Sequence, residues 1–310
     1  MTARLLSGKP IAEAIKAETA AEIAELKEKH GFAPCLAVVR VGEDPASAVY
    51  VGNKVKTSEE VGMISEHRHL PATATHEEVA KVVDELNRRD DVDGILVQLP
   101  LPSQIDETAI LEAIDPKKDV DGFHPINVGR LAQGQKGLVP CTPAGVIQIL
   151  KRSGIDIAGK HAVIVGRSNI VGKPMAMLLL QENATVTICH SRTTDLPAVT
   201  SQGDILVAAI GRAGFIRSEH IKEGAAVVDV GINSVSDAKA IEELFAGEDL
   251  EKRRATIEKR GSTLCGDVSA KDAMEKAESF TPVPGGVGLL TVAMLMRNTV
   301  DAAKVRRNIQ

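Results

Sequence analysis

The segment "HAVIVGRSNIVGKPMAMLLL", residues 161–180, places a short apolar run directly before a glycine-rich turn and an apolar, helix-like stretch. A turn that ends a strand and begins a helix is where the pyrophosphate of a dinucleotide binds in doubly wound α/β folds. Its glycines are Gly166 and Gly172, and Ser168 stands where the usual G-x-G-x-x-G motif has its middle glycine. Taken alone, the segment fits either an altered nucleotide site or an ordinary tight turn.

The end of the next predicted strand indicates which dinucleotide would bind. In NAD-binding folds an acidic residue about 20 residues after the first glycine hydrogen-bonds the ribose hydroxyls. Here the chain reads Cys189-His190-Ser191-Arg192, without a carboxylate. Ser191 and Arg192, together with Arg167 in the turn, suit a 2′-phosphate better. The sequence therefore favours NADP over NAD.

Strand-like runs alternate with helix-like stretches along most of the chain. Helices are predicted between the strands, and Thr75 with Glu78 forms a capping-box pattern before one of them. The predicted strands are 35–41, 94–99, 161–165, 185–189, 205–210 and 225–230. Such alternation is typical of parallel sheets covered on both faces, so the predicted fold class is α/β. A chain of 310 residues is long enough for two domains. The charge-rich stretch 236–262 interrupts the alternation, and we interpret it as a partly helical surface insertion.

The composition argues against several classes of function. A net charge of −5, no Trp and a single Tyr do not fit a nucleic-acid binder. The four cysteines form no C-x-x-C pair, which argues against a zinc or disulfide framework and fits a reducing compartment. The eight histidines suggest no metal-ligand cluster, so no metal is predicted. The longest apolar run, 287–296, is too short to span a membrane, and 1–10 has no signal core, so we expect a cytoplasmic protein.

The first half and the C-terminal end contain a second group of candidate residues. Tyr50 and Lys54 are four residues apart and share a helix face, while Gln98 lies at the end of a predicted strand. Asp119 and Asp121 lie in the loop "KKDVDGFHP", and "TPVPGGVG" (281–288) contains the pair Gly285-Gly286. Paired glycines let a backbone approach a ligand closely. Each feature alone also has a purely structural explanation: an amphipathic helix, a turn or a helix entry.

The combination of motifs is far more specific than any one of them. In order along the chain stand Y-V-x-x-K, V-Q-L-P-L-P, K-D-V-D-G-F, P-C-T-P-x-G, V-G-R-S-x-I-V-G-x-P and P-G-G-V-G. In these motifs and their spacing the chain resembles the bifunctional methylenetetrahydrofolate dehydrogenase/methenyltetrahydrofolate cyclohydrolase (FolD) family over nearly its whole length. The resemblance implies an enzyme of one-carbon and purine metabolism.

The resemblance implies two α/β domains flanking a cleft, the C-terminal one Rossmann-like, and a homodimer formed through the nucleotide domain. The folate-binding, catalytic domain would comprise 1–142 plus 281–310, because the C-terminal helix returns to the first half, and the NADP domain 143–280. The implied catalytic residues are Lys54, Gln98 and Asp121. The implied folate contacts are these three with Tyr50, Pro282, Gly285 and Gly286. The implied NADP contacts are Gly166, Arg167, Ser168, Ser191, Arg192 and Ile232.

The implied reactions are oxidation of 5,10-methylenetetrahydrofolate with NADP and hydrolysis of the methenyl product to 10-formyltetrahydrofolate. An alternative is a monofunctional or NAD-dependent dehydrogenase, against which the intact Lys54 and Gln98 argue. A non-catalytic nucleotide-sensing protein would have degraded site residues, and a shikimate-dehydrogenase-like enzyme has no reason to carry both V-Q-L-P-L-P and P-G-G-V-G. The partners expected are tetrahydrofolate derivatives and a second copy of the chain, with no nucleic acid or membrane.

Three departures from the family pattern stand out. After P-G-G-V-G the family continues with Pro-Met-Thr, whereas this chain has Leu289-Leu290-Thr291. The stretch 237–262 is longer than we expect for the family. Lys173 lies at a variable position beside the phosphate turn and could add positive charge there.

Overall fold

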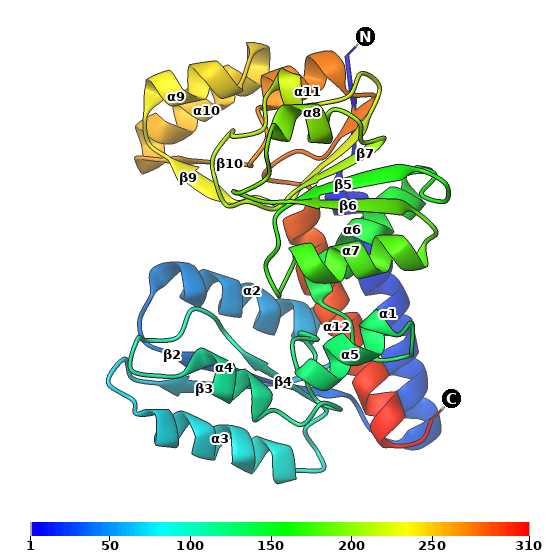
Figure 1. Cartoon of the computed structure of the whole chain (residues 1–310). Coiled ribbons are helices and arrows are strands. Elements are labelled where there is room, and N and C mark those ends of the chain that lie inside the picture. The colour runs from blue at the N-terminus through cyan, green and yellow to red at the C-terminus, as the bar shows by residue number, and fades with distance from the viewer. Residues whose placement is uncertain (1, 310) are drawn as a thin grey trace. The chain divides into compact units, whose positions relative to one another are not determined.

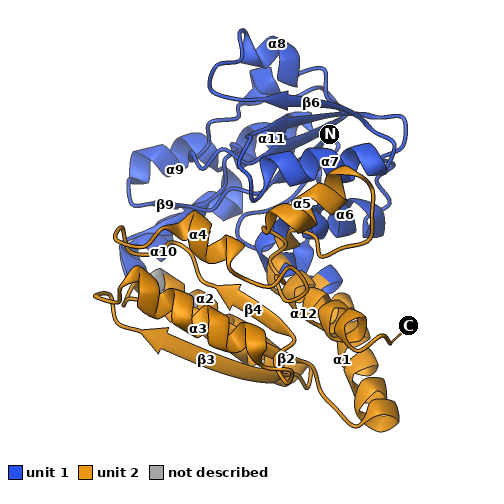
Figure 2. Cartoon of the chain, turned by 60° about the horizontal axis from the view of Figure 1, so that its bottom comes forward, with its two compact units in different colours: residues 1–11, 142–290 blue, residues 12–141, 291–310 orange. Residues whose placement is uncertain are grey.

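The computed structural model describes residues 2–309, which divide into two compact units (Figure 2). Unit 1 contains the chain up to Ile11 together with Thr142–Leu290, and unit 2 contains Ala12–Cys141 together with the chain from Thr291. The chain therefore passes from one unit to the other three times. Among the described residues, no helix is both long and apolar enough to cross a membrane.

Unit 2 is built on a three-stranded parallel sheet in the order β3-β2-β4, with helices on both of its faces (Figure 1). Its elements are α1 (Gly8–His30), β2 (Cys35–Val41), α2 (Pro45–Glu60), β3 (Ile64–Leu70), α3 (His76–Arg88), β4 (Gly94–Val97), α4 (Glu107–Glu112), α5 (Pro125–Ala132) and α12 (Val287–Arg306); α1 and α12 begin in unit 1. The predicted capping box is present, since Thr75 caps α3 and Glu78 bonds back to its backbone N–H.

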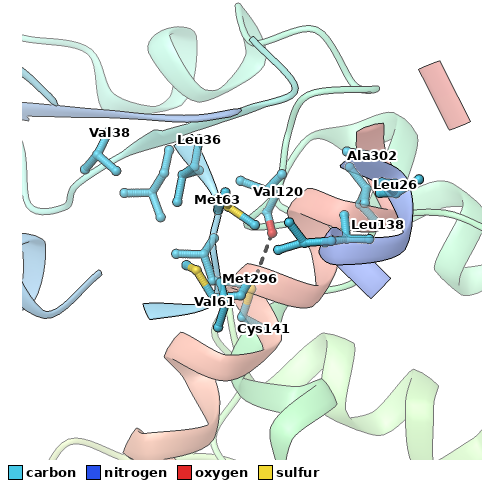
Figure 3. Close-up of a cluster of buried hydrophobic side chains, with 14 of the residues drawn as sticks. Leu26, Leu36, Val38, Val61, Met63, Val120, Leu138, Cys141, Met296 and Ala302 are labelled. Carbon is cyan, nitrogen blue, oxygen red and sulfur yellow. Dashed lines mark hydrogen bonds between the residues drawn. The ribbon is translucent and has the colours of Figure 1, made fainter. Parts of the chain in front are cut away.

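The central strand β2 supplies side chains to two separate cores. Leu36 and Val38 pack with residues of α1, α2 and α12, as the close-up in Figure 3 shows in part. Ala37 and Val39 pack with residues of α3 and α4. Because successive side chains of a strand point to opposite faces, an unbroken apolar run such as 35–41 is buried on both. Parallel pairing then aligns the carboxyl ends of β2 and β4 at one edge of the sheet.

Unit 1 is built on a six-stranded parallel sheet in the order β1-β11-β8-β7-β5-β6. Helices α6 and α7 cover one face, and α8 and α11 cover the other (Figure 1). Its elements are β1 (Arg4–Leu5), α6 (Cys141–Arg152), β5 (His161–Val165), α7 (Gly172–Gln181), β6 (Thr185–Cys189), α8 (Leu196–Thr200), β7 (Ile205–Ala208), a 3₁₀ turn (Ser218–His220), β8 (Ala226–Asp229), β9 (Asn233–Val235), α9 (Ala238–Leu244), α10 (Gly247–Arg260), β10 (Thr263–Cys265), α11 (Ala270–Lys276) and β11 (Ser279–Phe280).

The order of the strands creates a switch point beside β5. The chain goes from β5 to β6 on one side and then crosses to β7 on the other. In open α/β sheets, ligands bind beyond the carboxyl ends of the strands at such a switch point. The turn 166–172 follows β5 directly and therefore lies at this position.

The charge-rich insertion is partly helical, as its sequence predicts. Helix α10 buries none of its side chains, whereas Ile241, Leu244 and Phe245 form a small core with Cys265. The antiparallel pair β9–β10 connects the insertion to the unit. The insertion thus has a buried side as well as a solvated one.

The compact units do not follow the predicted domain boundaries at every point. Strand β1 pairs with β11, and the Gly8 N–H donates to the Gly285 carbonyl, so the first eleven residues and 281–290 group with the nucleotide-type sheet. The C-terminal chain from Thr291 groups with unit 2. The predicted assignment of folate binding to 1–142 plus 281–310 and of NADP binding to 143–280 concerns ligands and stays a prediction.

Candidate active site

The structure brings Lys54 and Gln98 together in unit 2. The Lys54 Nζ donates a hydrogen bond of 2.9 Å to Oε1 of Gln98, although 44 residues separate them. Lys54 lies on α2 one turn after Tyr50, and Gln98 directly follows β4. The Gln98 Nε2 donates to the Leu99 carbonyl at 2.7 Å. This second bond fixes the amide so that its oxygen faces the lysine.

Asp121 is the third predicted catalytic residue, and its charge is coupled to that of Lys54. Burial raises the pKa of Asp121 to about 6, while the Lys54 ammonium lowers it and Asp119 raises it further. A carboxyl group with this pKa changes its protonation state close to neutral pH. The structure thus groups a lysine, an amide and a carboxylate in unit 2.

The loop that carries Asp121 is held by the C-terminal helix. The Nδ2 of Asn298, buried on α12, donates to the carbonyls of Val120 and Val139 at 2.8 Å each. The Sγ–H of Cys141 also donates to the Val120 carbonyl, drawn as a dashed line in Figure 3. Gly122 has φ +72°, and a Cβ there would lie 2.5 Å from the Val139 carbonyl carbon. Sequence reasoning missed Asn298, because an asparagine within a helix carries no local sign of a distant partner.

Two buried charged residues stabilise the start of the same loop. Asp119 accepts hydrogen bonds from the backbone N–H groups of Phe123 and His124 and from Asn127. Lys118 is 2% exposed, and its Nζ donates to three carbonyls at the end of α3. Of the two aspartates in the motif, Asp119 therefore holds the backbone of the loop.

Tyr50 is 44% exposed on α2. An aromatic ring exposed one helical turn from a lysine offers a flat surface to a ring of a ligand. The two residues share a helix face, as their spacing predicts.

In unit 1, the glycines of the turn after β5 are required by close backbone packing. Gly166 has φ +136°, and a Cβ there would collide with the Ala209 carbonyl oxygen in the loop after β7. A Cβ on Gly172 would collide with the Gly166 carbonyl oxygen. The glycines let the loops after β5 and β7 meet at the switch point.

Ser168 organises the turn from within. Its Oγ accepts hydrogen bonds from the Val171 N–H at 3.1 Å and the Gly172 N–H at 3.3 Å, at the start of α7. The hydroxyl proton stays available to an acceptor. Arg167 is exposed beside it, and the Nζ of Lys173 donates to Asn169. The turn thus presents a helix start and a guanidinium at the edge where a phosphate would bind.

Ser191, Arg192 and Ile232 also lie after strands of this sheet. Ser191 and Arg192 follow β6 and are exposed, and the Arg192 N–H donates to the His190 ring. Ile232 follows β8 and is 48% exposed. All the predicted cofactor residues therefore follow the carboxyl ends of parallel strands in unit 1.

Pro282, Gly285 and Gly286 lie in unit 1, in the turn between β11 and α12. Both glycines are required by the backbone: Gly285 has φ +110°, and a Cβ on Gly286 would lie 2.6 Å from the Pro282 carbonyl oxygen. Leu290, one of the departures from the family pattern, is buried, with Gly145 of α6 against it.

The insertion contributes Arg253 to the same turn. Its guanidinium donates to the Val283 carbonyl at 2.8 Å and to the Leu264 carbonyl at 2.6 Å, and it stacks 4.6 Å from the Phe245 ring centroid. Sequence reasoning missed this residue, because one arginine in the run "EKRRATIEKR" looks like the others.

Among residues 2–309, no three His, Cys, Asp or Glu side chains form a group that could hold a metal ion. His67 and His69 stack with ring centroids 6.0 Å apart on β3.

The fold and these residues define a two-domain α/β protein with a dinucleotide-type turn in one unit and a lysine–amide–carboxylate group in the other. Residues 6–121 match the catalytic domain of tetrahydrofolate dehydrogenase/cyclohydrolase, and 140–307 match its NAD(P)-binding domain. The chain belongs to the tetrahydrofolate dehydrogenase/cyclohydrolase family.

Individual relatives agree with the family assignment. The chain is 58% identical to the bifunctional protein FolD of Koribacter versatilis over 99% of both chains. It resembles the crystal structure of the bifunctional enzyme FolD from Campylobacter jejuni with a TM-score of 0.87 and 46% identity, over 97% of this chain and 99% of that one. The FolD of Trypanosoma brucei, solved with NADP and an inhibitor, has a TM-score of 0.87 and 38% identity over 98% of each chain.

Proposed function

We propose that this enzyme oxidises 5,10-methylenetetrahydrofolate to the methenyl form with NADP and then hydrolyses the methenyl product to 10-formyltetrahydrofolate. The observation that carries the proposal is the 2.9 Å hydrogen bond between Lys54 and Gln98 in the unit that contains Asp121. Membership of the bifunctional family supports both activities.

The first reaction moves a hydride from the carbon between two nitrogens of the folate to the nicotinamide. The nitrogen lone pairs stabilise the methenyl cation that forms, so no base is needed. Catalysis then consists of orienting that carbon against the nicotinamide ring. A charged ammonium would oppose the developing cation, so we propose that the Lys54 ammonium gives its proton to solvent before this step, with Gln98 holding the amine in place.

The second reaction adds water to the methenyl carbon and opens the ring. Neutral Lys54 would take one proton from that water as a general base. The remaining hydroxyl proton would pass to the nitrogen that leaves the carbon, as the C–N bond breaks and the formyl C=O forms. Gln98 keeps the amine directed by accepting its hydrogen bond. The lysine then returns its proton to solvent.

The folate contacts follow from the chemistry of the side chains. The Asp121 carboxylate would pair with the amino and ring N–H donors of the pterin, a bidentate arrangement suited to a carboxylate. Tyr50 would stack on the aminobenzoyl ring. The turn that contains Pro282, Gly285 and Gly286 would contribute backbone contacts.

The cofactor contacts would begin at the turn after β5. Gly166 permits the turn, and Ser168 and Arg167 would contact phosphate oxygens. Ser191 and Arg192 would hold the 2′-phosphate and give preference for NADP over NAD. Ile232 would contact the nicotinamide end.

We further propose a homodimer formed through unit 1. Strand β6 is an edge strand of the six-stranded sheet. Its Ile188 is 41% exposed, and Leu180 of α7 is 64% exposed. An apolar sheet edge of this kind is a template for pairing with a second strand. Light scattering of the wild type should give twice the chain mass, and Ile188→Lys should shift it toward one chain mass. A wild type of one chain mass would refute the dimer.

We also propose a reducing, cytoplasmic location, supported by four buried cysteines, all of them free thiols.

The decisive test follows reduced cofactor and methenyl absorbance together, with 5,10-methylenetetrahydrofolate and either NADP or NAD. Reduction of NADP without lasting methenyl signal supports both activities. Reduction with accumulating methenyl product would leave only the dehydrogenase and remove the hydrolytic role of Lys54. Preference for NAD would refute the role of Ser191 and Arg192, and no reduction with either cofactor would refute the function.

A further inference from the structure

Asp267, at the bend between β10 and α11, is fully buried in unit 1 and accepts four hydrogen bonds through its carboxylate. Three come from consecutive backbone N–H groups after β7, those of Ile210, Gly211 and Arg212, at 2.5, 2.9 and 2.9 Å. The fourth comes from Nδ2 of Asn233 after β8, at 2.9 Å. One carboxylate therefore joins two loops that follow neighbouring parallel strands.

A second buried carboxylate holds Asp267 in place. Asp229, at the end of β8, accepts hydrogen bonds from the backbone N–H groups of Asp267, Val268 and Gly231. Burial raises the pKa of Asp229 to about 7, and the neighbouring Asp267 contributes. The hydrogen bonds that the two carboxylates accept come from backbone N–H groups and from the Asn233 amide. Backbone dipoles and the Asn233 amide thus replace the usual cation.

Two glycines make room for these side chains. A Cβ on Gly231 would collide with the Asp267 carboxylate, and a Cβ on Gly266 would collide with the Asp229 carboxylate. Gly231 directly precedes Ile232, the residue expected at the nicotinamide end. Because Gly231 packs directly against the Asp267 carboxylate, a movement of Asp267 would also move Ile232.

We propose that Asp267 is a positioning residue for the nicotinamide end of the cofactor, because its carboxylate sets the spacing of the loops 210–212 and 231–233. Both loops lie at the carboxyl edge of the sheet, where dinucleotide folds build the nicotinamide pocket. The proposal rests on the proposed NADP-dependent function. Asp267 acts through these loops and does not contact the reacting atoms.

The variant Asp267→Asn tests this role. An asparagine of the same shape presents an NH₂ group to some of the N–H donors, so those donors lose their acceptor and the loops move apart. We expect NADP to bind about tenfold more weakly by calorimetry, with the KM for NADP raised to match. Affinity for 2′,5′-ADP, which lacks the nicotinamide, should stay within about twofold. Cyclohydrolase activity on added methenyltetrahydrofolate should be unchanged.

The matched control is Asp204→Asn. The Asp204 carboxylate also accepts a backbone hydrogen bond, from the His161 N–H, but at the opposite, amino edge of the same sheet. The Asp204→Asn variant should have a lower free energy of unfolding, but the ratio of its affinities for NADP and 2′,5′-ADP should be unchanged. Equal losses of both ligands in Asp267→Asn, or no loss of either, would overturn the proposal.

If Asp267→Asn does not fold, a milder variant tests the same proposal. Asn233→Ala removes one of the four donors, and we expect a weaker NADP-selective loss of about threefold. Unchanged NADP affinity in a folded Asn233→Ala would overturn the proposal. A wild type that neither binds nor reduces NADP would instead refute the proposed function, so the two failures are distinguishable.

Discussion

The Nζ of Lys54 and Oε1 of Gln98 lie 2.9 Å apart, and the second hydrogen bond of Gln98, to the Leu99 carbonyl, fixes the direction of the first. The lysine therefore reaches the site as one half of an oriented pair. Because a helix supplies one partner and a strand end the other, the pair depends on the packing of α2 against the sheet.

Replacing this lysine should separate methenyl hydrolysis from folate binding. We expect Lys54→Met to lower the rate of methenyl hydrolysis at least 100-fold, in the range that a general base contributes, while folate still binds. Loss of methenyl absorbance measures the rate. Lys56→Met, on the same helix with a largely exposed side chain, is the control. Ring opening at the normal rate in Lys54→Met would remove the lysine from the mechanism.

Folate affinity should depend on pH through Asp121. Its pKa is raised from 3.8 to about 6, so the carboxylate is ionised above pH 6 and protonated below it. Since the ionised form accepts the pterin N–H donors, affinity for 5-formyltetrahydrofolate should fall as pH falls from 7 to 5, with calorimetry as the measurement. Asp121→Asn should bind more weakly and lose the transition near pH 6. A wild type with constant affinity over this range would contradict the proposed contact.

The coenzyme preference should change at the end of β6. Ser191→Asp would place a carboxylate beside the expected 2′-phosphate, repelling it and offering an acceptor to the NAD ribose. We expect the ratio of kcat/KM for NADP to that for NAD to fall about 100-fold. Lys160→Gln makes the same change in net charge at the amino edge of the sheet and should leave the ratio unchanged. An unaltered ratio in Ser191→Asp would mean that the 2′-phosphate binds elsewhere.

The insertion should stabilise unit 1 through a single arginine. Arg253→Met removes charge-assisted donors from the Val283 and Leu264 carbonyls, and we expect the free energy of unfolding to fall by about 2–3 kcal/mol. Urea denaturation measures the change. Its neighbour Arg254 pairs with Glu242 and Glu251 at the surface, so Arg254→Met should cost less than about 1 kcal/mol. Equal losses in the two variants would show that the bonds to Val283 and Leu264 add no stability.

Local sequence patterns predicted the strands and the helix start that depend on neighbouring residues of the chain. The apolar runs of β2, β5 and β6 match the structure at both ends, and the capping box at Thr75 starts α3. The strands predicted to end at 99, 210 and 230 end one or two residues earlier, where their loops begin. The predicted strand series omits β3, because its sequence "ISEHRHL" belongs to a sheet edge and is mainly polar.

In the candidate site, too, residues within local motifs were predicted and residues that act through distant partners were not. Tyr50, Lys54, Gln98 and Asp121 were predicted because motifs mark them, and the structure places Gln98 against Lys54. Asp267, Asn298 and Arg253 act through partners that lie 11 to 178 residues away. Nothing in the flanking sequence identifies such partners, because tertiary packing alone brings them into reach.

The pairing of β1 with β11 has a consequence for synthesis of the chain. Arg4 and Leu5 are synthesised long before their partners Ser279 and Phe280, which follow most of the residues of both units. N-terminal segments generally begin to fold during synthesis. Until β11 has been synthesised, the backbone groups of β1 that pair with it remain exposed to solvent. The six-stranded sheet is therefore complete only when β11 emerges and pairs with β1 on one side and with β8 on the other.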